Sequence, residues 1–160
     1  MNRDPAILWF RNDLRLSDNA ALAAAVKRAG SQVVYVYIRE TDTNARRAGG
    51  ASDWWLDKSL RALQDDLRCL GGDLILRSGN PAAELAQLIR ETGATSVFWN
   101  RRYAKQARDL DADIKATLRD KSICVETFNG TLLNEPWTIA TKTGAYYKVF
   151  TPYWRAASQQ

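Results

Sequence analysis

The sequence lacks histidine altogether and has only two cysteines, and both shortages limit its chemistry. Without histidine, the commonest general base and metal ligand of proteins is missing, which excludes a Ser-His nucleophile and a zinc hydrolase centre. Cys69 and Cys124 do not have the spacing of a metal site. In a cytosolic chain, two such cysteines are typical of reduced residues in the core, and we expect that here.

Two further kinds of segment are missing. Gly49-Gly50 and Gly71-Gly72 flank a predicted helix without the strand–loop–helix context of a P-loop or dinucleotide fingerprint, so Walker-type nucleotide hydrolysis is not expected. No stretch approaches the roughly 18 apolar residues that cross a bilayer, and the amino terminus has no secretory pattern. We therefore expect a cytoplasmic protein with no membrane partner.

What is present is typical of one soluble globular domain. The 160 residues are 46% hydrophobic and 26% charged, which is average for that class. A chain of this length buries about two-thirds of its unfolded surface. The net charge of +5 permits a polyanionic partner but does not demonstrate one.

The stretch Ala6–Leu22 indicates where function lies. Its apolar run, Ala6–Phe10, predicts a strand buried on both faces, as in a parallel sheet. The charged residues that follow lie where this strand would end, and Ser17-Asp18-Asn19 then provide capping residues for an Ala-rich helix, Ala20–Ala29. Because open α/β sheets bind ligands just outside the carboxyl ends of their strands, we look for a site there.

Strand and helix patterns alternate over the first 130 residues. Such alternation predicts an α/β fold, a doubly wound sheet of five parallel strands covered by helices on both faces. Periodicity does not give the strand order. The predicted strands are Ala6–Phe10, Val33–Ile38, Asp73–Arg77, Ser96–Trp99 and Ile123–Thr127, and the predicted helices are Ala20–Ala29, a leucine-striped helix from Ser52-Asp53 to Gly71-Gly72, one from Asn80-Pro81 to Gly93, and Ala104–Leu118.

Three other segments carry separate expectations. The segment Arg39–Gly50 is long for a strand-to-helix loop, which indicates either mobility or closure over a ligand. One of Trp54 and Trp55 should face the core, leaving the other as a candidate for contact with a partner. Residues 131–160 are interrupted by proline and glycine and are rich in aromatics. We divide the chain into an α/β domain, 1–130, and a second part, 131–160, that does not complete another strand–helix unit.

Charged and polar residues follow the first and fourth strands. After the first, Arg11, Asp13 and Arg15 alternate, which favours either a salt-bridge lattice that stiffens the turn or a ligand contact by Arg11 or Asn12. These two interpretations are compatible. After the fourth strand comes Asn100-Arg101-Arg102-Tyr103. If strands one and four are neighbours, the two segments form the lips of one crevice.

The residues around this crevice suit a flat conjugated ligand, because aromatic faces and guanidinium planes stack on such molecules. Trp9, Phe10 and Trp99 bring aromatic surface near, although both tryptophans could equally belong to the core. The basic run that begins at Arg101 could likewise be only the solvated start of a helix.

Four stretches of the sequence resemble the DNA photolyase and cryptochrome family. They are WFRNDLRLSDNAAL at Trp9–Leu22, GGASDWWLDKSL at Gly49–Leu60, NRRY at Asn100–Tyr103 and YYKVFTPYWRA at Tyr146–Ala156. Their order and spacing also fit, so the resemblance covers essentially the whole chain.

The resemblance implies the amino-terminal domain of a photolyase or cryptochrome, with a Rossmann-like sheet of five parallel strands. In complete members, a helical carboxyl-terminal domain holds FAD, the electron-relay tryptophans and the pocket for an extruded pyrimidine dimer. The parent protein would be a deoxyribodipyrimidine photo-lyase, with damaged DNA as its partner. This chain would then carry no catalytic residues and be inactive by itself, and residues 131–160 would begin the linker to the FAD domain. We expect Tyr153 and Trp154 to be disordered or held by a neighbouring molecule.

The resemblance also implies a light-harvesting role for this domain. Such domains bind an antenna chromophore, which is methenyltetrahydrofolate, a deazaflavin or FMN, and pass its excitation to FAD. By analogy, the chromophore would contact Phe10, Arg11, Asn12, Asp13, Glu40, Asn100, Arg101 and Gln106. Folate-binding members carry an Asn-Glu pair where this chain has Gln106-Ala107. Gln106 retains the capacity to hydrogen-bond a pterin, whereas Ala107 supplies no carboxylate.

Two other classes of function compete with this one. One is a free-standing nucleotide-binding domain of the electron-transfer flavoprotein or universal stress protein type, for which the tail Tyr146–Ala156 would have no purpose. The other is a DNA-binding module, indicated by the net charge of +5. That module would need a basic stripe, yet acidic residues are scattered among the basic ones; they are Asp57, Asp65, Asp66, Asp109, Asp111 and Asp113.

Overall fold

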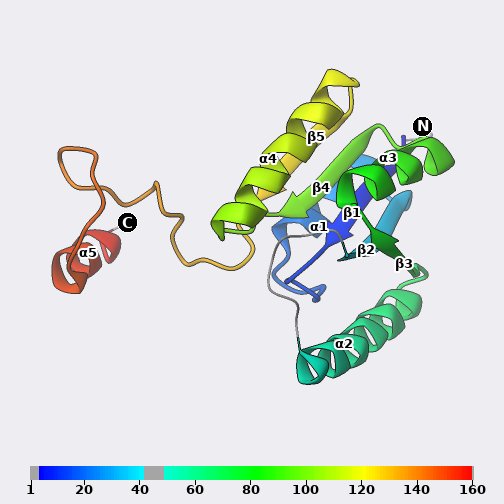
Figure 1. The fold of residues 1–160 in the computed structure, drawn as a ribbon, viewed down its shortest axis with the longest axis horizontal. Coiled ribbons are helices and arrows are strands. Elements are labelled where there is room, and N and C mark those ends of the chain that lie inside the picture. The colour runs from blue at the N-terminus through cyan, green and yellow to red at the C-terminus, as the bar shows by residue number, and fades with distance from the viewer. Residues whose placement is uncertain (1–3, 42–48, 160) are drawn as a thin grey trace. The chain divides into compact units, whose positions relative to one another are not determined.

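The computed structural model describes residues 4–41 and 49–159. The chain divides into two compact units, Met1–Gly130 and Thr131–Gln160. Figure 1 shows the elements in chain order. They are β1 (Ala6–Phe10), α1 (Ala20–Ala29), β2 (Val33–Glu40), α2 (Gly50–Cys69), β3 (Leu74–Gly79), α3 (Pro81–Thr92), β4 (Ser96–Asn100), α4 (Lys105–Asp120), β5 (Cys124–Phe128) and α5 (Phe150–Ala157).

The first unit contains a five-stranded sheet in the order β3-β2-β1-β4-β5, and every pair of neighbouring strands is parallel. This confirms the predicted α/β fold and the adjacency of strands one and four. Ala6 of β1 is in register with Val33 of β2 on one side and with Ser96 of β4 on the other. The strand order reverses between β1 and β4, so the topological switch point lies there.

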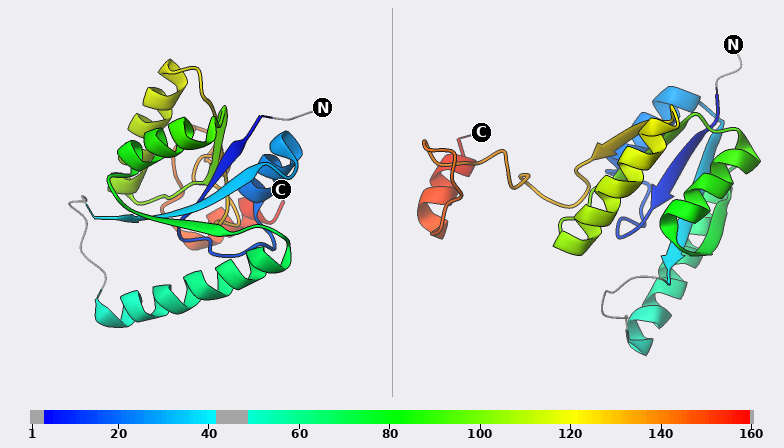
Figure 2. Two further views of the ribbon diagram at one scale, coloured as in Figure 1. Left: turned by 90° about the vertical axis from the view of Figure 1, so that its right-hand side faces the viewer. Right: turned by 45° about the horizontal axis from the view of Figure 1, so that its top comes forward.

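Each face of the sheet has its own hydrophobic core, because successive residues of a strand point to opposite faces. On one face, Trp9 and Trp99 are buried with Leu85 of α3 and Ile114 of α4. The opposite core contains Leu8, Phe10 and Phe98 with Ala21 and Ala25 of α1 and Leu63 and Leu67 of α2. Figure 2 (left) shows α3 and α4 on one side of the sheet and α2 on the other. Both β1 and β4 are buried along their whole length, as expected for the centre of a covered sheet.

Capping residues act largely as predicted. Asn19 accepts a hydrogen bond from the Leu22 amide at 3.1 Å, and Asn80 accepts from the Ala82 and Ala83 amides at 3.0 and 3.2 Å. Gly93 ends α3 in the left-handed conformation. Gly30 follows α1 with a positive φ of 63° and a ψ of −122°, which lies outside the left-handed helical region.

The prediction that one of Trp54 and Trp55 faces the core is wrong. Both side chains are exposed, at 60% and 67%. Helix α2 begins at Gly50, two residues before the predicted start, and its buried residues, Leu63 and Leu67, lie in its second half. Its first turns therefore have no core to face. Leu70, the last member of the predicted leucine stripe, follows the helix and is also exposed.

Three other sequence predictions need adjustment. Cys69 and Cys124 are free but exposed, so the prediction that they belong to the core is wrong; Cys69 is the last residue of α2 and Cys124 the first of the edge strand β5. Strand β2 extends to Glu40, so Arg39 and Glu40 belong to the sheet rather than to a loop. Residues 42–48, where the predicted mobile or closing loop falls, lie outside the described residues.

The second unit contains helix α5 in its described part and no strand. Tyr153 and Trp154 lie within α5, with Tyr153 partly buried and Trp154 exposed. That these side chains are disordered or held by a neighbouring molecule stays a prediction. The rings of Phe150 and Trp154 are stacked, with centroids 6.1 Å apart. Across residues 4–41 and 49–159, no helix is long and apolar enough to span a membrane.

Candidate functional site

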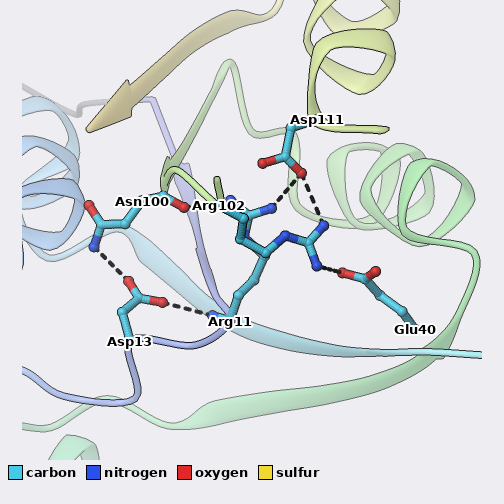
Figure 3. Close-up of polar contacts among 6 residues, drawn as sticks. All are labelled: Arg11, Asp13, Glu40, Asn100, Arg102 and Asp111. Atoms are coloured by element: carbon cyan, nitrogen blue, oxygen red, sulfur yellow. Dashed lines mark hydrogen bonds and ion pairs between the residues drawn. The ribbon is translucent and has the colours of Figure 1, made fainter. Parts of the chain in front are cut away.

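The segments that follow β1 and β4 meet at the carboxyl edge of the sheet, as predicted. Arg11, directly after β1, donates through Nη2 to the backbone oxygen of Asn100, the last residue of β4, at 2.5 Å. Through Nη1, Arg11 forms an ion pair with Asp111 of α4 at 2.6 Å. Figure 3 shows these groups converging at the switch point. One guanidinium thus joins β1, β4 and α4.

Asn100 forms a second junction between the same strands. Its Nδ2 donates to Asp13 at 2.6 Å and to Asn19 at 2.9 Å, and its Oδ1 accepts from the Ala21 amide at 3.3 Å. The other oxygen of Asp13 accepts from the Arg11 amide at 2.9 Å. The carboxylate of Asp13 and the amide of Asn100 are both buried, and their polar atoms form hydrogen bonds. The turn after β1 is therefore held in one conformation.

Arg11 is a buried cation with aromatic neighbours. Its guanidinium carbon lies 4.5 Å from the ring centroid of Trp9 and 5.8 Å from that of Trp99. Burial lowers the pKa of Arg11, while the adjacent Asp111 carboxylate opposes that shift. Because guanidinium groups keep their proton in proteins, Arg11 remains charged and needs a buried anion. The indole rings of Trp9 and Trp99 both belong to the core. Of the two interpretations of these tryptophans, ligand contact and core packing, the structure supports core packing.

Arg102 extends the network toward β2. It donates to Glu40 at 2.6 Å through Nη1 and to Asp111 at 3.1 Å through Nη2. Glu40, Arg102, Asp111 and Arg11 therefore form a continuous series of alternating charges at the ends of β2, β4 and β1 (Figure 3). Two cations and two carboxylates balance each other, which offsets the cost of taking each out of water.

The role of Asp111 was not predicted from the sequence, where this residue was grouped with scattered acidic residues. A signal for burial was present, however. Asp111 lies three and seven residues before Ile114 and Leu118, so all three occupy one face of α4, and all three are buried. A carboxylate in an apolar helical stripe indicates a buried cation that pairs with it.

The remaining predicted site residues lie at different depths. Phe10 is fully buried in the core shared with α1 and α2, with its ring 6.4 Å from that of Tyr35. Arg101 is partly buried and donates to the backbone oxygen and to Oγ1 of Thr127 in β5. Asn12 and Gln106 are exposed. The polar contacts thus unite Arg11, Asp13, Glu40 and Asn100, whereas Arg101 turns toward β5.

Tyr37 is a further residue near the end of β2 that sequence analysis did not single out. Its pKa is raised, first by burial and then by the negative charge of Glu40. Two residues further along β2, Arg39 forms an ion pair with Asp53 in the first turn of α2 at 3.3 Å. This pair ties the start of α2 to the same edge of the sheet.

The charged side chains at this edge of the sheet are engaged with one another. Its buried acids and bases are paired with each other, and the described residues include no cluster of His, Cys, Asp or Glu that could hold a metal ion. Polar groups face the solvent at this edge of the sheet. The ion-paired residues beneath them form a support whose charges balance. Such a surface can orient a flat polar ligand by hydrogen bonds at its edges.

Comparison with known proteins gives the family of this chain. The DNA photolyase family model matches residues 6–160. The chain is 51% identical over 152 residues to a deoxyribodipyrimidine photo-lyase of Agrobacterium fabrum, covering 95% of this chain and 31% of that protein. It is 37% identical over 150 residues to cryptochrome-2 of Arabidopsis thaliana, covering 93% of this chain and 24% of that protein.

Solved structures show the same relationship. A bacterial class III photolyase from Agrobacterium tumefaciens superposes with a TM-score of 0.92 at 48% identity, over 100% of this chain and 33% of that one. An archaeal photolyase from Sulfolobus tokodaii shares the fold, with a TM-score of 0.79 at 20% identity, over 98% of this chain and 35% of that one.

The chain therefore spans about a third of the length of these photolyases. The free-standing electron-transfer flavoprotein or universal stress protein alternative is not favoured, because the match to photolyases extends through residue 160 and includes the aromatic tail. This sequence, with its five-stranded parallel sheet and its linked β1 and β4 ends, belongs to the DNA photolyase family.

Proposed function

We propose that this chain is the light-harvesting domain of a photolyase or cryptochrome. It binds an antenna chromophore at the carboxyl edge of the sheet, and the chromophore passes its excitation to FAD in a helical domain of the same protein. The support is twofold: family membership, and a switch point built from residues that the family resemblance already implicated.

The observation that carries the proposal is the junction of Arg11 with Asn100 and Asp111. Excitation transfer requires no bond between the two pigments, but it depends on a fixed separation and orientation. A support of buried, ion-paired and hydrogen-bonded side chains beneath the binding edge meets that need, since it fixes the backbone that carries the exposed residues.

The predicted site residues then divide into two roles. Asn12 and Gln106 present exposed amides, and we assign to them direct hydrogen bonds with the chromophore. Glu40 and Arg101 are partly exposed and add polar contacts at the rim. The buried residues, Phe10, Arg11, Asp13 and Asn100, act as support beneath the ligand.

The chromophore is a folate, a deazaflavin or FMN. The amide of Gln106 can hydrogen-bond a pterin, whereas Ala107 supplies no carboxylate beside it. The Glu40 carboxylate at this edge is already paired with Arg102. The archaeal photolyase from Sulfolobus tokodaii was solved with two FAD molecules and interpreted as implying a novel light-harvesting cofactor, so flavins stay among the candidates.

For the whole protein, we propose light-dependent DNA repair or signalling, with the FAD-binding domain and damaged DNA as partners, in the cytoplasm. The two most similar proteins described above are photolyases. The present chain has no catalytic role of its own in this proposal; it extends the range of wavelengths that drive the flavin.

The test is a spectroscopic titration of the purified protein with methenyltetrahydrofolate, a deazaflavin and FMN. We expect saturable binding of one of them, seen as a shifted absorption band and increased fluorescence anisotropy. Asn12→Ala and Gln106→Ala should each weaken it by about 2- to 10-fold, as expected for one hydrogen bond. Gln87→Ala, an exposed glutamine on α3, is the matched control and should bind normally.

Three results would overturn the proposal. The first is the absence of binding for all three chromophores. The second is tighter binding of adenosine nucleotides than of any chromophore, measured by calorimetry, which would favour a nucleotide-binding domain instead. Salt-sensitive nanomolar binding of undamaged DNA by this chain would favour the DNA-binding module.

A further inference from the structure

The α/β unit ends at Gly130, two residues after β5, and the chain then passes into the second unit. This glycine lies directly against the switch point. A Cβ there would be 2.6 Å from Cβ and Cγ of Asn100 and 2.8 Å from its Nδ2. Asn100 is the last residue of β4 and is buried. The backbone of Gly130 therefore packs on the Asn100 amide at a separation that only glycine allows.

Arg15 holds the carbonyl group of the same glycine. Its Nη2 donates to the backbone oxygen of Gly130 at 2.7 Å and to that of Asp18 at 2.9 Å. The guanidinium also lies 3.5 Å from the Asp18 carboxylate. Asp18 has a positive φ of 47°, a backbone conformation that aspartate adopts more readily than most residues. One arginine thus joins the turn before α1 to the end of the α/β unit, 115 residues further along the chain.

These contacts close into a ring of four residues. The side-chain amide of Asn19 donates to the backbone oxygen of Arg15 at 3.1 Å, and its Oδ1 accepts from Nδ2 of Asn100 at 2.9 Å. Asn100 packs against Gly130, and Gly130 accepts from Arg15. Because each member of a closed ring is restrained from two directions, Gly130 stays in place as long as Arg15 and Asn100 hold it.

The ring includes a side chain that also supports the proposed chromophore edge. Nδ2 of Asn100 donates to Asp13 at 2.6 Å (Figure 3), and Asp13 follows the exposed site residue Asn12. The segment that leads out of the α/β unit is therefore fastened to the segment that carries this site residue. The Gly130 carbonyl belongs to the planar peptide group that joins Gly130 to Thr131. Holding that oxygen fixes both the place and the direction in which the chain continues.

We propose that Arg15 is a positioning residue for excitation transfer, which sets the geometry between the chromophore edge and the FAD domain by holding the Gly130 carbonyl where the chain leaves the α/β unit. This inference rests on the proposed antenna function and adds to it a residue that does not touch the chromophore. The two arginines after β1 then have different roles. Arg11 supports the binding edge, whereas Arg15 determines how the bound chromophore is oriented toward the flavin.

The first experiment measures backbone order parameters by 15N NMR relaxation in this chain. In the wild type, the amides of Gly130 and Thr131 should have values of about 0.85, as in rigid backbone, and in Arg15→Gln they should fall below about 0.6. Arg15→Lys keeps one donor group and should give intermediate values. Arg61→Gln is the matched control, because it removes an exposed arginine that pairs with Asp57 on α2, and it should change neither amide.

The second experiment measures excitation transfer in the complete protein. The protein is loaded with FAD and with whichever of methenyltetrahydrofolate, a deazaflavin or FMN binds in the titration described above. Transfer efficiency is obtained from chromophore fluorescence with and without FAD. Arg15→Gln should lose transfer efficiency while binding the chromophore with wild-type affinity, and Arg15→Lys should recover part of the loss. Arg61→Gln should behave as the wild type in both respects.

The outcomes separate this inference from the function on which it rests. If no chromophore binds to the wild type, the antenna proposal itself fails. If the wild type binds and transfers but Arg15→Gln transfers equally well, the antenna proposal stands and this inference is wrong. Unchanged order parameters at Gly130 and Thr131 in Arg15→Gln would also overturn it. So would a loss of chromophore affinity in Arg15→Gln that accounts for the lost transfer, or an equal loss of transfer in Arg61→Gln.

Discussion

The guanidinium of Arg11 and the carboxylate of Asp111 form a buried ion pair at 2.6 Å between positions 100 residues apart in the sequence. The pair links the end of β1 to the middle of α4. Asp111 also accepts from Arg102, so a single carboxylate holds the segments after both β1 and β4. Removing it leaves two guanidinium groups without their shared anion.

Asp111→Asn should therefore destabilise the protein strongly. Breaking a buried ion pair by neutralising one partner typically costs about 3–5 kcal/mol, because the remaining charge is left uncompensated. Urea unfolding at neutral pH measures the effect. Asp109→Asn is the control, since it removes an exposed carboxylate that pairs with Lys105 on the same helix and should change the midpoint little. An Asp111→Asn midpoint equal to that of the wild type would contradict this account of the network.

Gly130→Ala should disturb the same site because the added methyl group would clash with Asn100. A Cβ at Gly130 would lie 2.6 Å from both Cβ and Cγ of Asn100, a buried residue that cannot swing away. We expect a loss of about 1–3 kcal/mol, typical of overpacking, together with displacement of the Asn100 amide from Asp13.

Chemical denaturation and the amide NMR signal of Asn100 report these two effects. Gly50→Ala is the control, because nothing lies within 4 Å of a Cβ there and alanine favours the helix that Gly50 begins. Equal stability of the two variants would show that the space beside Asn100 is not constrained.

Asp73 should contribute to acid sensitivity. Hydrogen bonds from Gln64, Arg68 and the Leu74 amide lower its pKa in the folded state. In the unfolded chain the pKa of an aspartate carboxyl is about 3.9. Just below that pH, the unfolded state therefore binds more protons than the folded state. The stabilisation is therefore complete above this value and is lost as the pH falls through the lower, folded pKa.

Urea midpoints measured between about pH 3 and pH 6 test this prediction. The stability gap between the wild type and Asp73→Asn should be widest near pH 6 and should close on acidification. Gln64→Ala should show part of the same change, since it removes the first of the hydrogen bonds. A gap that stays constant or widens toward acid would contradict the assigned cause.

The sequence predicted the fold well because its signals were local. The apolar run Ala6–Phe10, the cap at Asn80 and the glycine at Gly93 each act over a few residues, and all appear where expected. The adjacency of strands one and four required a further condition, the doubly wound order, which the structure confirms.

The sequence predictions that were wrong depend on packing between segments that are far apart in the chain. Helical periodicity alone placed one of Trp54 and Trp55 in the core, but whether a core exists beside the first turns of α2 depends on the length of the sheet. Asp111 was grouped with surface acids because its partner, Arg11, lies 100 residues away. Cys69 ends a helix and Cys124 begins an edge strand, and both are exposed because these positions depend on how the elements pack.

The most direct test of the central claim is a crystal structure of the protein with its bound chromophore. This account predicts density for a flat heterocycle at the carboxyl edge of the sheet, in contact with Asn12 and Gln106 and supported by the Arg11–Asn100 junction. A chromophore bound at the opposite edge of the sheet, or one that touches neither of the segments after β1 and β4, would contradict it.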